Sequence, residues 1–172
     1  MELGLTFPLQ RFLKLRFVPY GDPEAHLFYC WDLHCITLLG RPSLLAVHCH
    51  SRHTAVAFDV SPAQWADLPA FGADIIRQSL TAAGPPPAQV EAYLRRAGGP
   101  LFTRTHGRRP VAFLNRAWDD VLALDMAVDP AACHQPFLER AVNRCRCHCA
   151  GYEGWGKAED FLKRAWAEHL PF

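Results

Sequence analysis

Two kinds of hydrophobic pattern divide the chain. From Phe28 to Val60, short β-favouring stretches are interrupted at the "GRP" turn (40–42) and at the polar run 50–53, which predicts a three-stranded antiparallel meander. After Val60, apolar residues recur mainly at intervals of three and four, which predicts helices. Strands followed by helices indicate an α+β fold: a three- to four-stranded antiparallel sheet with helices packed on one face and a helical C-terminal half.

Caps and breakers mark the ends of the expected helices. "SPAQ" (61–64) is a capping box with proline at the first helical position, and Pro69 is expected to break or re-angle the helix that it opens. "LFTRT" (101–105) is a candidate fourth strand. Further helices are predicted over 88–97, from Pro110, from Asp129 with the stripe Leu138, Val142, Cys145 and Cys149, and at the C-terminus with Phe161, Ala165 and Trp166.

Length and composition set broad limits on the class of protein. The chain has 172 residues, half of them hydrophobic, and a formal net charge of +1, so we expect one domain spanning 1–172 and no global field that attracts nucleic acid or anionic membrane. No stretch approaches the roughly 20 apolar residues of a membrane helix, and the N-terminus is unlike a signal peptide. A cytoplasmic protein without a membrane partner is therefore predicted, and the odd number of seven cysteines favours reduced thiols.

The first candidate site lies on the predicted sheet. Residues two apart on a strand share a face, so Cys30, Asp32 and His34 point to one side. His48 and His50 likewise share a face on the next strand. A three-residue loop would bring the two sets opposite each other, whereas a two-residue loop would separate them. Thiolate, carboxylate and imidazole are zinc ligands, but a polar sheet face exposed to water is the simpler interpretation.

The second candidate is the cysteine run "CRCHC" (145–149), with Cys133 and His134 upstream as further potential ligands. Its spacing is not that of a standard zinc site, because paired C-x-x-C knuckles are absent. Cys145 and Cys149 instead continue an apolar helical stripe, and free cysteine behaves as a small buried hydrophobe. Core packing is the preferred interpretation.

The third candidate is an anion site at "TRTHGRRP" (103–110), where arginines, a histidine and hydroxyls precede a helix that proline starts. Helix N-termini favour negative charge, and the planar guanidinium binds phosphate or carboxylate with two hydrogen bonds. The competing interpretation is a solvated basic turn. The candidate anion site comprises Arg41, Thr103, Arg104, Thr105, His106, Arg108, Arg109 and Asn115.

Two stretches of the sequence, "FYCWDLHCITLLGRPSLLAV" and "VEAYLRRAGGPLFTRTHGRRPVAFLNRAWDDV", form a recognisable pattern. They resemble a bacterial family of small proteins, domain of unknown function 6933. The resemblance covers roughly 28–125 and leaves 126–172 as a helical, Cys-rich extension. The resemblance implies a Trp-containing strand, a basic turn, two further strands, and then helices. It supplies no chemistry. The matching positions are Trp31, Arg41, Phe102, Thr103, Arg104, Thr105, Arg109, Leu114 and Asn115.

The chain also departs from that family pattern. His34 and Cys49 stand where the family pattern has asparagines, and Pro42 stands where a second arginine is usual. If the histidines and cysteines are peculiar to this chain, a metal site built from them is not the shared function of the family.

No nucleophile elbow, P-loop, dinucleotide fingerprint or H-E-x-x-H motif is present. The sequence leaves open whether the protein is an enzyme. We expect a binding or regulatory module for an anionic small molecule, nucleic acid or protein partner, recognised through the Arg-rich turn. The alternative is a zinc-binding protein or metal-dependent hydrolase that uses the Cys/His cluster of the sheet; apart from zinc, no cofactor is expected.

Overall fold

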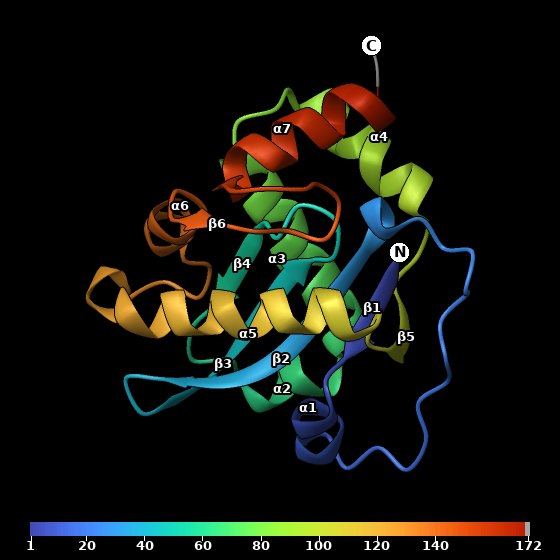
Figure 1. Cartoon of the computed structure of the whole chain (residues 1–172). Helices are drawn as coiled ribbons and strands as arrows, with labels where there is room; N and C mark the ends of the chain where they lie inside the picture. Colours follow the sequence, from blue (N-terminus) through green and yellow to red (C-terminus); the bar gives the residue numbers. More distant parts are fainter. Residues whose placement is uncertain (171–172) are drawn as a thin grey trace.

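A five-stranded mixed sheet forms the centre of the molecule in the computed structural model, which describes residues 1–170 (Figure 1). The strand order is β4-β3-β2-β1-β5. β1 runs parallel to both of its neighbours, β2 and β5. β3 runs antiparallel to both of its neighbours, β2 and β4. The strands are β1 (Glu2–Leu5), β2 (Cys30–Leu38), β3 (Arg41–His48), β4 (Thr54–Ala57) and β5 (Leu101–Arg104).

The predicted meander and the predicted strand at "LFTRT" are both present. The expectation of a purely antiparallel sheet of three or four strands is wrong, because β1 enters between β2 and β5 and pairs in parallel with each. β1 has only four residues and one of them is Gly4, so it offers too short an alternation to stand out as a strand. The chain reaches β2 from β1 through a long connection that contains α1 (Phe7–Phe12) and a 3₁₀ turn, η1 (Leu27–Tyr29).

Helices cover both faces of the sheet, which corrects the expectation of helices on one face. Figure 1 shows α5 crossing in front of the strands and α3 behind them. β3 and β4 carry continuous apolar runs, "LLAV" and "TAVA", which are typical of strands buried on both faces. The remaining helices and short elements are α2 (Pro62–Ala66), α3 (Leu68–Ala82), α4 (Pro87–Ala97), α5 (Arg108–Ala123), η2 (Asp125–Ala127), α6 (Pro136–Asn143), β6 (Arg146–Cys147), β7 (Gly156–Lys157) and α7 (Ala158–His169).

Two hydrophobic clusters result, one on each face. Trp31 and Leu33 of β2 point into the larger cluster with α2, α3, α4 and α7. Ile36 and Leu38 point into the smaller cluster with α5 and α6. No helix within residues 1–170 has the length and apolar character to cross a membrane.

The β2–β3 hairpin turns at Leu39 and Gly40, both of which have positive φ, at 45° and 75°. Such a two-residue turn matches the twist of the strands. It pairs Trp31 with His48, so the three-residue loop required by the histidine cluster of the sheet is not formed. The register therefore separates the two predicted sets of ligands.

Helix ends agree with the predicted caps at some positions and differ at others. Ser61 and Gln64 form the capping box, and the helix breaks at Asp67 between α2 and α3. The expectation that Cys145 and Cys149 continue a helical stripe is wrong, because α6 ends at Asn143. The buried Cys149 packs into the larger cluster instead, on the other face from α6.

α6 also covers the outer edge of the sheet with polar side chains. Asn143 accepts the N–H of Thr54 at 2.8 Å and donates to its carbonyl at 2.9 Å. Glu139 accepts the N–H of Val56 at 2.8 Å. These side chains satisfy backbone groups of the edge strand β4 that would otherwise face solvent.

We expect the stability of the protein to fall in acid partly through His53. Burial lowers the pKa of this side chain from 6.5 to about 4. Between those pH values the unfolded chain binds a proton that the folded chain does not, so the free energy of unfolding decreases as the pH falls through this window. His53→Gln should remove about 3 kcal/mol of that decrease, measured by urea titration at several pH values. His148→Gln should retain the wild-type decrease; an unchanged decrease in His53→Gln would contradict the assignment.

A buried arginine and an exposed one should differ sharply in their contribution to stability. Arg52 is 2% exposed and binds Asp120 of α5 at 2.6 Å, so Arg52→Ala should cost about 2–3 kcal/mol. The exposed pair of Arg77 with Glu91 supplies the control, and Arg77→Ala should cost less than about 1 kcal/mol. Equal losses in thermal denaturation would show that the ion pair of Arg52 does not anchor α5.

Candidate metal centre

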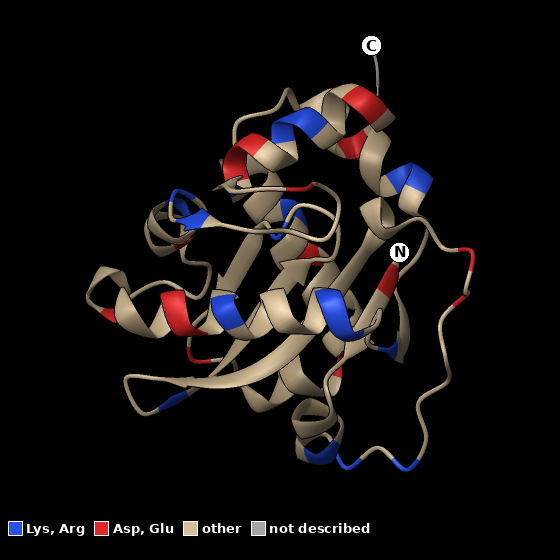
Figure 2. Cartoon of the chain, in the orientation of Figure 1, with Lys and Arg blue, Asp and Glu red and all other residues tan. Residues whose placement is uncertain are grey.

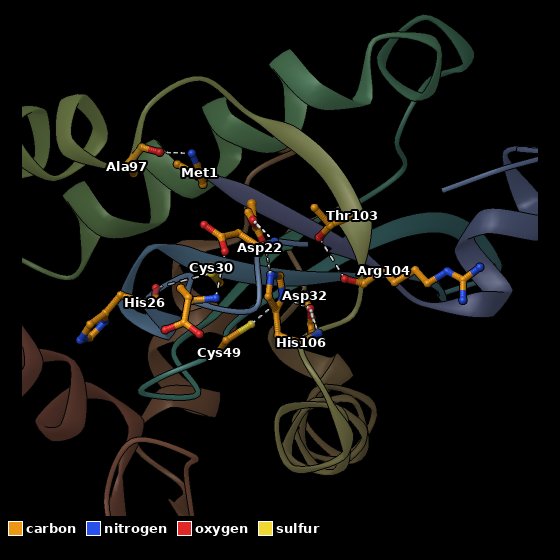
Figure 3. Close-up of polar contacts among 12 residues, drawn as sticks. Met1, Asp22, His26, Cys30, Asp32, Cys49, Ala97, Thr103, Arg104 and His106 are labelled. Carbon is orange, nitrogen blue, oxygen red and sulfur yellow. Dashed lines mark hydrogen bonds and ion pairs between the residues drawn. The ribbon is translucent and has the colours of Figure 1, made fainter. Parts of the chain in front are cut away.

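Five polar side chains from four segments meet on the face of the sheet that α5 covers. Parallel pairing places Glu2 beside Cys30 and Gly4 beside Asp32, so these positions share a face. Cys49 follows β3, and its N–H binds the carbonyl of Cys30 at 3.0 Å. The turn from β5 into α5 supplies His106. Figure 3 shows Cys30, Asp32, Cys49 and His106 gathered at this point. We call Glu2, Cys30, Asp32, Cys49 and His106 the central cluster.

His106 is the hub of the central cluster. Its Nδ1 lies 2.7 Å from Asp32 Oδ1 and 3.4 Å from Cys49 Sγ. Its Nε2 lies 2.9 Å from Glu2 Oε2. The backbone N–H of His106 also donates to Asp32 Oδ1 at 3.2 Å. The two ring nitrogens therefore face two separate groups of potential ligands.

Glycines make room for these contacts. A Cβ added at Gly4 would overlap the Asp32 carboxylate and lie 2.9 Å from His106 Nδ1. A Cβ added at Gly21 would overlap the Glu2 carboxylate, which also accepts the N–H of Asp22 at 2.8 Å. Gly4 is thus required where the backbone of β1 passes close to the acid and the imidazole.

Burial and charge together define the electrostatics of the central cluster. The Asp32 and His106 side chains are 1% and 7% exposed, and two carboxylates face one imidazole. Burial alone would lower the pKa of His106, but its hydrogen bond to Asp32 and the neighbouring thiols of Cys30 and Cys49 outweigh burial and raise that pKa well above its ordinary value. Burial and the neighbouring charge of Asp32 raise the pKa of Cys49 well above its ordinary value. Two acids around one base favour a cation at this place.

The donor atoms fit a metal ion in two overlapping sets. Asp32, Cys49 and His106 form one set, and Glu2, Cys30 and His106 form the other. Within each set the donor atoms lie within 4.8 Å of one another. Carboxylate, thiolate and imidazole together suit a borderline-soft ion of the zinc class.

The structure brings two of the predicted metal ligands, Cys30 and Asp32, into the central cluster and leaves out the three histidines. His34 lies on the same face as Asp32, but its Nδ1 binds Thr6 Oγ1 at 2.7 Å. His48 lies across the sheet beside Trp31, where both its nitrogens are bound, at 2.7 Å each, to Ser51 Oγ and the Phe28 carbonyl.

His50 lies apart from the central cluster, among the aromatic rings of His26, Tyr152 and His169. The second candidate, the cysteine run at 145–149, likewise contributes no residue to either set of donor atoms found in residues 1–170.

The residues of the predicted anion site do not converge. Arg41 pairs with Leu38, six residues along β2 from Asp32, which corresponds to about 20 Å of strand. Arg104 extends away from the central cluster (Figure 3), over the Tyr20 ring at 4.2 Å. Arg109 pairs with Glu153 at 3.0 Å.

The other members of that predicted set are also dispersed. Thr103 is buried and donates to the Arg104 carbonyl at 2.9 Å. Thr105 is half-buried beside Gly4, whereas Arg108 and Asn115 are exposed on α5. His106 alone reaches a polar centre, and its partners there are acids.

Sequence reasoning missed Glu2 and Cys49 as members of a site and assigned His106 to an anion. Gly4, two residues after Glu2, is the sequence signal that could have indicated Glu2. A glycine inside a strand often marks a place where another part of the chain approaches the backbone closely. The signal for Cys49 was its position at the end of a strand, next to a predicted turn.

The fold and the central cluster together define a small α+β protein with a buried polar centre between its mixed sheet and one covering helix. A family model described as "Domain of unknown function (DUF6933)" matches residues 2–161, and the chain belongs to this family. The match is wider than the expected 28–125: it includes β1 and the cysteine run, so 126–161 is not an extension outside the family. No curated protein and no solved structure matches the chain.

Gly4→Ala should destabilise the protein by about 1–3 kcal/mol, because the added methyl group forces Asp32 and His106 apart. Gly99→Ala is the matched control, since a Cβ there meets nothing within 4 Å. Chemical denaturation of both variants measures the difference. A Gly4→Ala protein as stable as Gly99→Ala would mean that β1 does not approach the central cluster as closely as described.

Proposed function

We propose that this protein binds a metal ion of the zinc class at Asp32, Cys49 and Nδ1 of His106. The observation that carries the proposal is the convergence of a carboxylate, a thiol and an imidazole nitrogen, from three separate segments, within 4.8 Å of one another. These three donor types are those that zinc takes in proteins.

Glu2 supports the choice of this set over the other one. A metal-bound histidine usually donates its second N–H to a carboxylate, which fixes the ring and strengthens the ligand. Glu2 Oε2 lies 2.9 Å from His106 Nε2 and is in place for that role. Its other carboxylate oxygen is already held by the N–H of Asp22.

A metal ion would also resolve the unfavourable electrostatics of the site. Buried thiols resist ionisation. The buried carboxylate of Asp32 and the partly buried carboxylate of Glu2 around one imidazole leave excess negative charge. A divalent cation offsets this charge and deprotonates a coordinating thiol. The three segments that carry the ligands are far apart in the sequence, so the ion would join β2, the end of β3 and the start of α5.

Burial favours a role in metal binding over substrate turnover. Cys49 is 3% exposed, and no residue of the central cluster lines the cavity between α6 and α7 or the more open one beside His134. The proposal concerns this chain and not the whole family, because Cys49 is one of the positions at which the resemblance leads us to expect a departure from the family pattern.

Metal analysis of protein purified without a His tag should give one zinc per chain after zinc loading and dialysis. Cobalt(II) loading should give a thiolate-to-cobalt charge-transfer band. Cys49→Ser should abolish the band and the stoichiometric metal, and Glu2→Gln should weaken zinc binding about 10- to 100-fold.

Two cysteine variants serve as controls for that experiment. Cys30→Ser should keep the stoichiometry, because Cys30 belongs to the other set of donors, and Cys145→Ser should behave as wild type. Thermal denaturation verifies that each variant is folded. Absence of stoichiometric metal in the wild type would overturn the proposal, and so would its loss in Cys145→Ser but not in Cys49→Ser. Loss of metal in Cys30→Ser alone would contradict the proposed ligands and indicate instead the set of Glu2, Cys30 and His106.

A further inference from the structure

A separate cavity lies among the end of α3, the start of α4, α6 and α7. Its volume is about 480 Å³, and no residue of the central cluster lines it. Small-molecule sites usually have volumes of about 300–1,000 Å³. The cavity is therefore of a suitable size for a small organic ligand.

One side of the cavity is apolar and rigid. Trp166 and Leu162 of α7 line it, together with Pro85 and Pro136 from the facing segments. The Trp166 ring stacks on Tyr93 at 5.3 Å with an interplanar angle of 21°. This packing holds the indole in place, and a wall of this kind suits a flat apolar body.

The floor is polar but largely neutral or paired. His53 Nε2 lies 3.0 Å from Ser79 Oγ, and burial lowers the pKa of His53 to about 4, so the imidazole is neutral at neutral pH. The Glu139 carboxylate accepts the N–H of Val56 and lies 3.1 Å from His134 Nε2. The floor thus offers no uncompensated positive charge, and the charged end of a ligand is not expected there.

The mouth of the cavity is positive. Arg140 of α6 and Lys163 of α7 line it, and Figure 2 shows basic positions on both helices. Arg140 has no ion pair within residues 1–170, and Lys163 meets Asp160 only at 4.0 Å, between exposed side chains. Arg144, which also lines the mouth, is paired with Glu159 at 3.2 Å. Arg140 and Lys163 are therefore the two cationic side chains at the mouth that can attract an anion.

We propose that this cavity binds a small organic anion whose flat apolar body lies against Trp166 and Leu162 and whose anionic group lies at Arg140 and Lys163. A carboxylate and a phosphate monoester share this chemistry. The proposal does not depend on metal binding, since the two sites have no residue in common.

Calorimetric titration with benzoate and with phenyl phosphate tests this proposal. We expect the wild type to bind at least one of the two probes, and the tighter one identifies the anionic group. Benzyl alcohol and inorganic phosphate should each bind more weakly than that probe, because each lacks one half of the recognised structure. The double variant Arg140→Gln with Lys163→Gln should weaken binding by about 10-fold or more.

Two further variants distinguish the cavity from general charge attraction. Ala82→Trp places a large side chain at the lining of the cavity and should abolish binding of both probes. Arg95→Gln with Arg96→Gln removes two cations from α4, and Cys49→Ser removes a proposed metal ligand; both should leave probe binding unchanged. No binding of either probe to the wild type, retained binding in Ala82→Trp, or equal losses in the two double variants would overturn the proposal.

Discussion

The parallel insertion of β1 between β2 and β5 is the constraint on which the polar centre of this protein depends. Four residues pair in register on both sides, Glu2 with Cys30 and with Leu101, and Leu5 with Leu33 and with Arg104. That pairing buries Leu3 and Leu5 completely. It also delivers a carboxylate and a glycine to the face where the chain turns from β5 into α5. Without β1, His106 Nε2 would lose the carboxylate of Glu2.

A buried imidazole between acids is stable only when each charge has a partner. Two carboxylates, two thiols and one imidazole occupy a site with little access to water, and the geometry around His106 gives each nitrogen its own acceptor. On the other face of the sheet, both ring nitrogens of His48 likewise form hydrogen bonds within the core. At these two places the buried polar groups have hydrogen-bond partners close by. Arg140 and Lys163, by contrast, are exposed at the cavity beside α7.

Local sequence patterns predict much of the fold. The elements that they do not predict depend on pairing between segments far apart in the sequence. The meander, the capping box at Ser61 and the helix that contains Pro110 each carry a signal within a few residues, although that helix begins at Arg108 and not at the proline. β1 does not, because its four residues gain their strand structure from neighbours about 30 and 100 positions away. Likewise, the hairpin register follows from the backbone twist at Leu39 and Gly40, where a leucine adopts positive φ against its usual preference.

The sequence predicts which types of residue form the candidate site on β2, but it does not predict which distant residues they contact. Alternation along β2 correctly placed Cys30 and Asp32 on one face, yet their partners come from β1, from the end of β3 and from the β5–α5 turn. Its position among arginines in the sequence assigns His106 to a predicted anion site. In space its side chain turns inward to two acids while Arg104 and Arg109 turn outward. Nearness in sequence was a poor guide because a turn sends successive side chains to opposite sides.

The polar side chains of α6 along β4 have a consequence for how the molecule behaves in a crowded solution. An uncovered edge strand is a template on which another chain can add a strand, and such additions begin aggregation. Here the amide of Asn143 occupies both hydrogen-bonding groups of Thr54, and Glu139 occupies the N–H of Val56. At the opposite edge, the Pro19 carbonyl accepts the N–H of Arg104. Side chains along β4 and a loop at β5 thus occupy some of the backbone groups with which a sixth strand would pair.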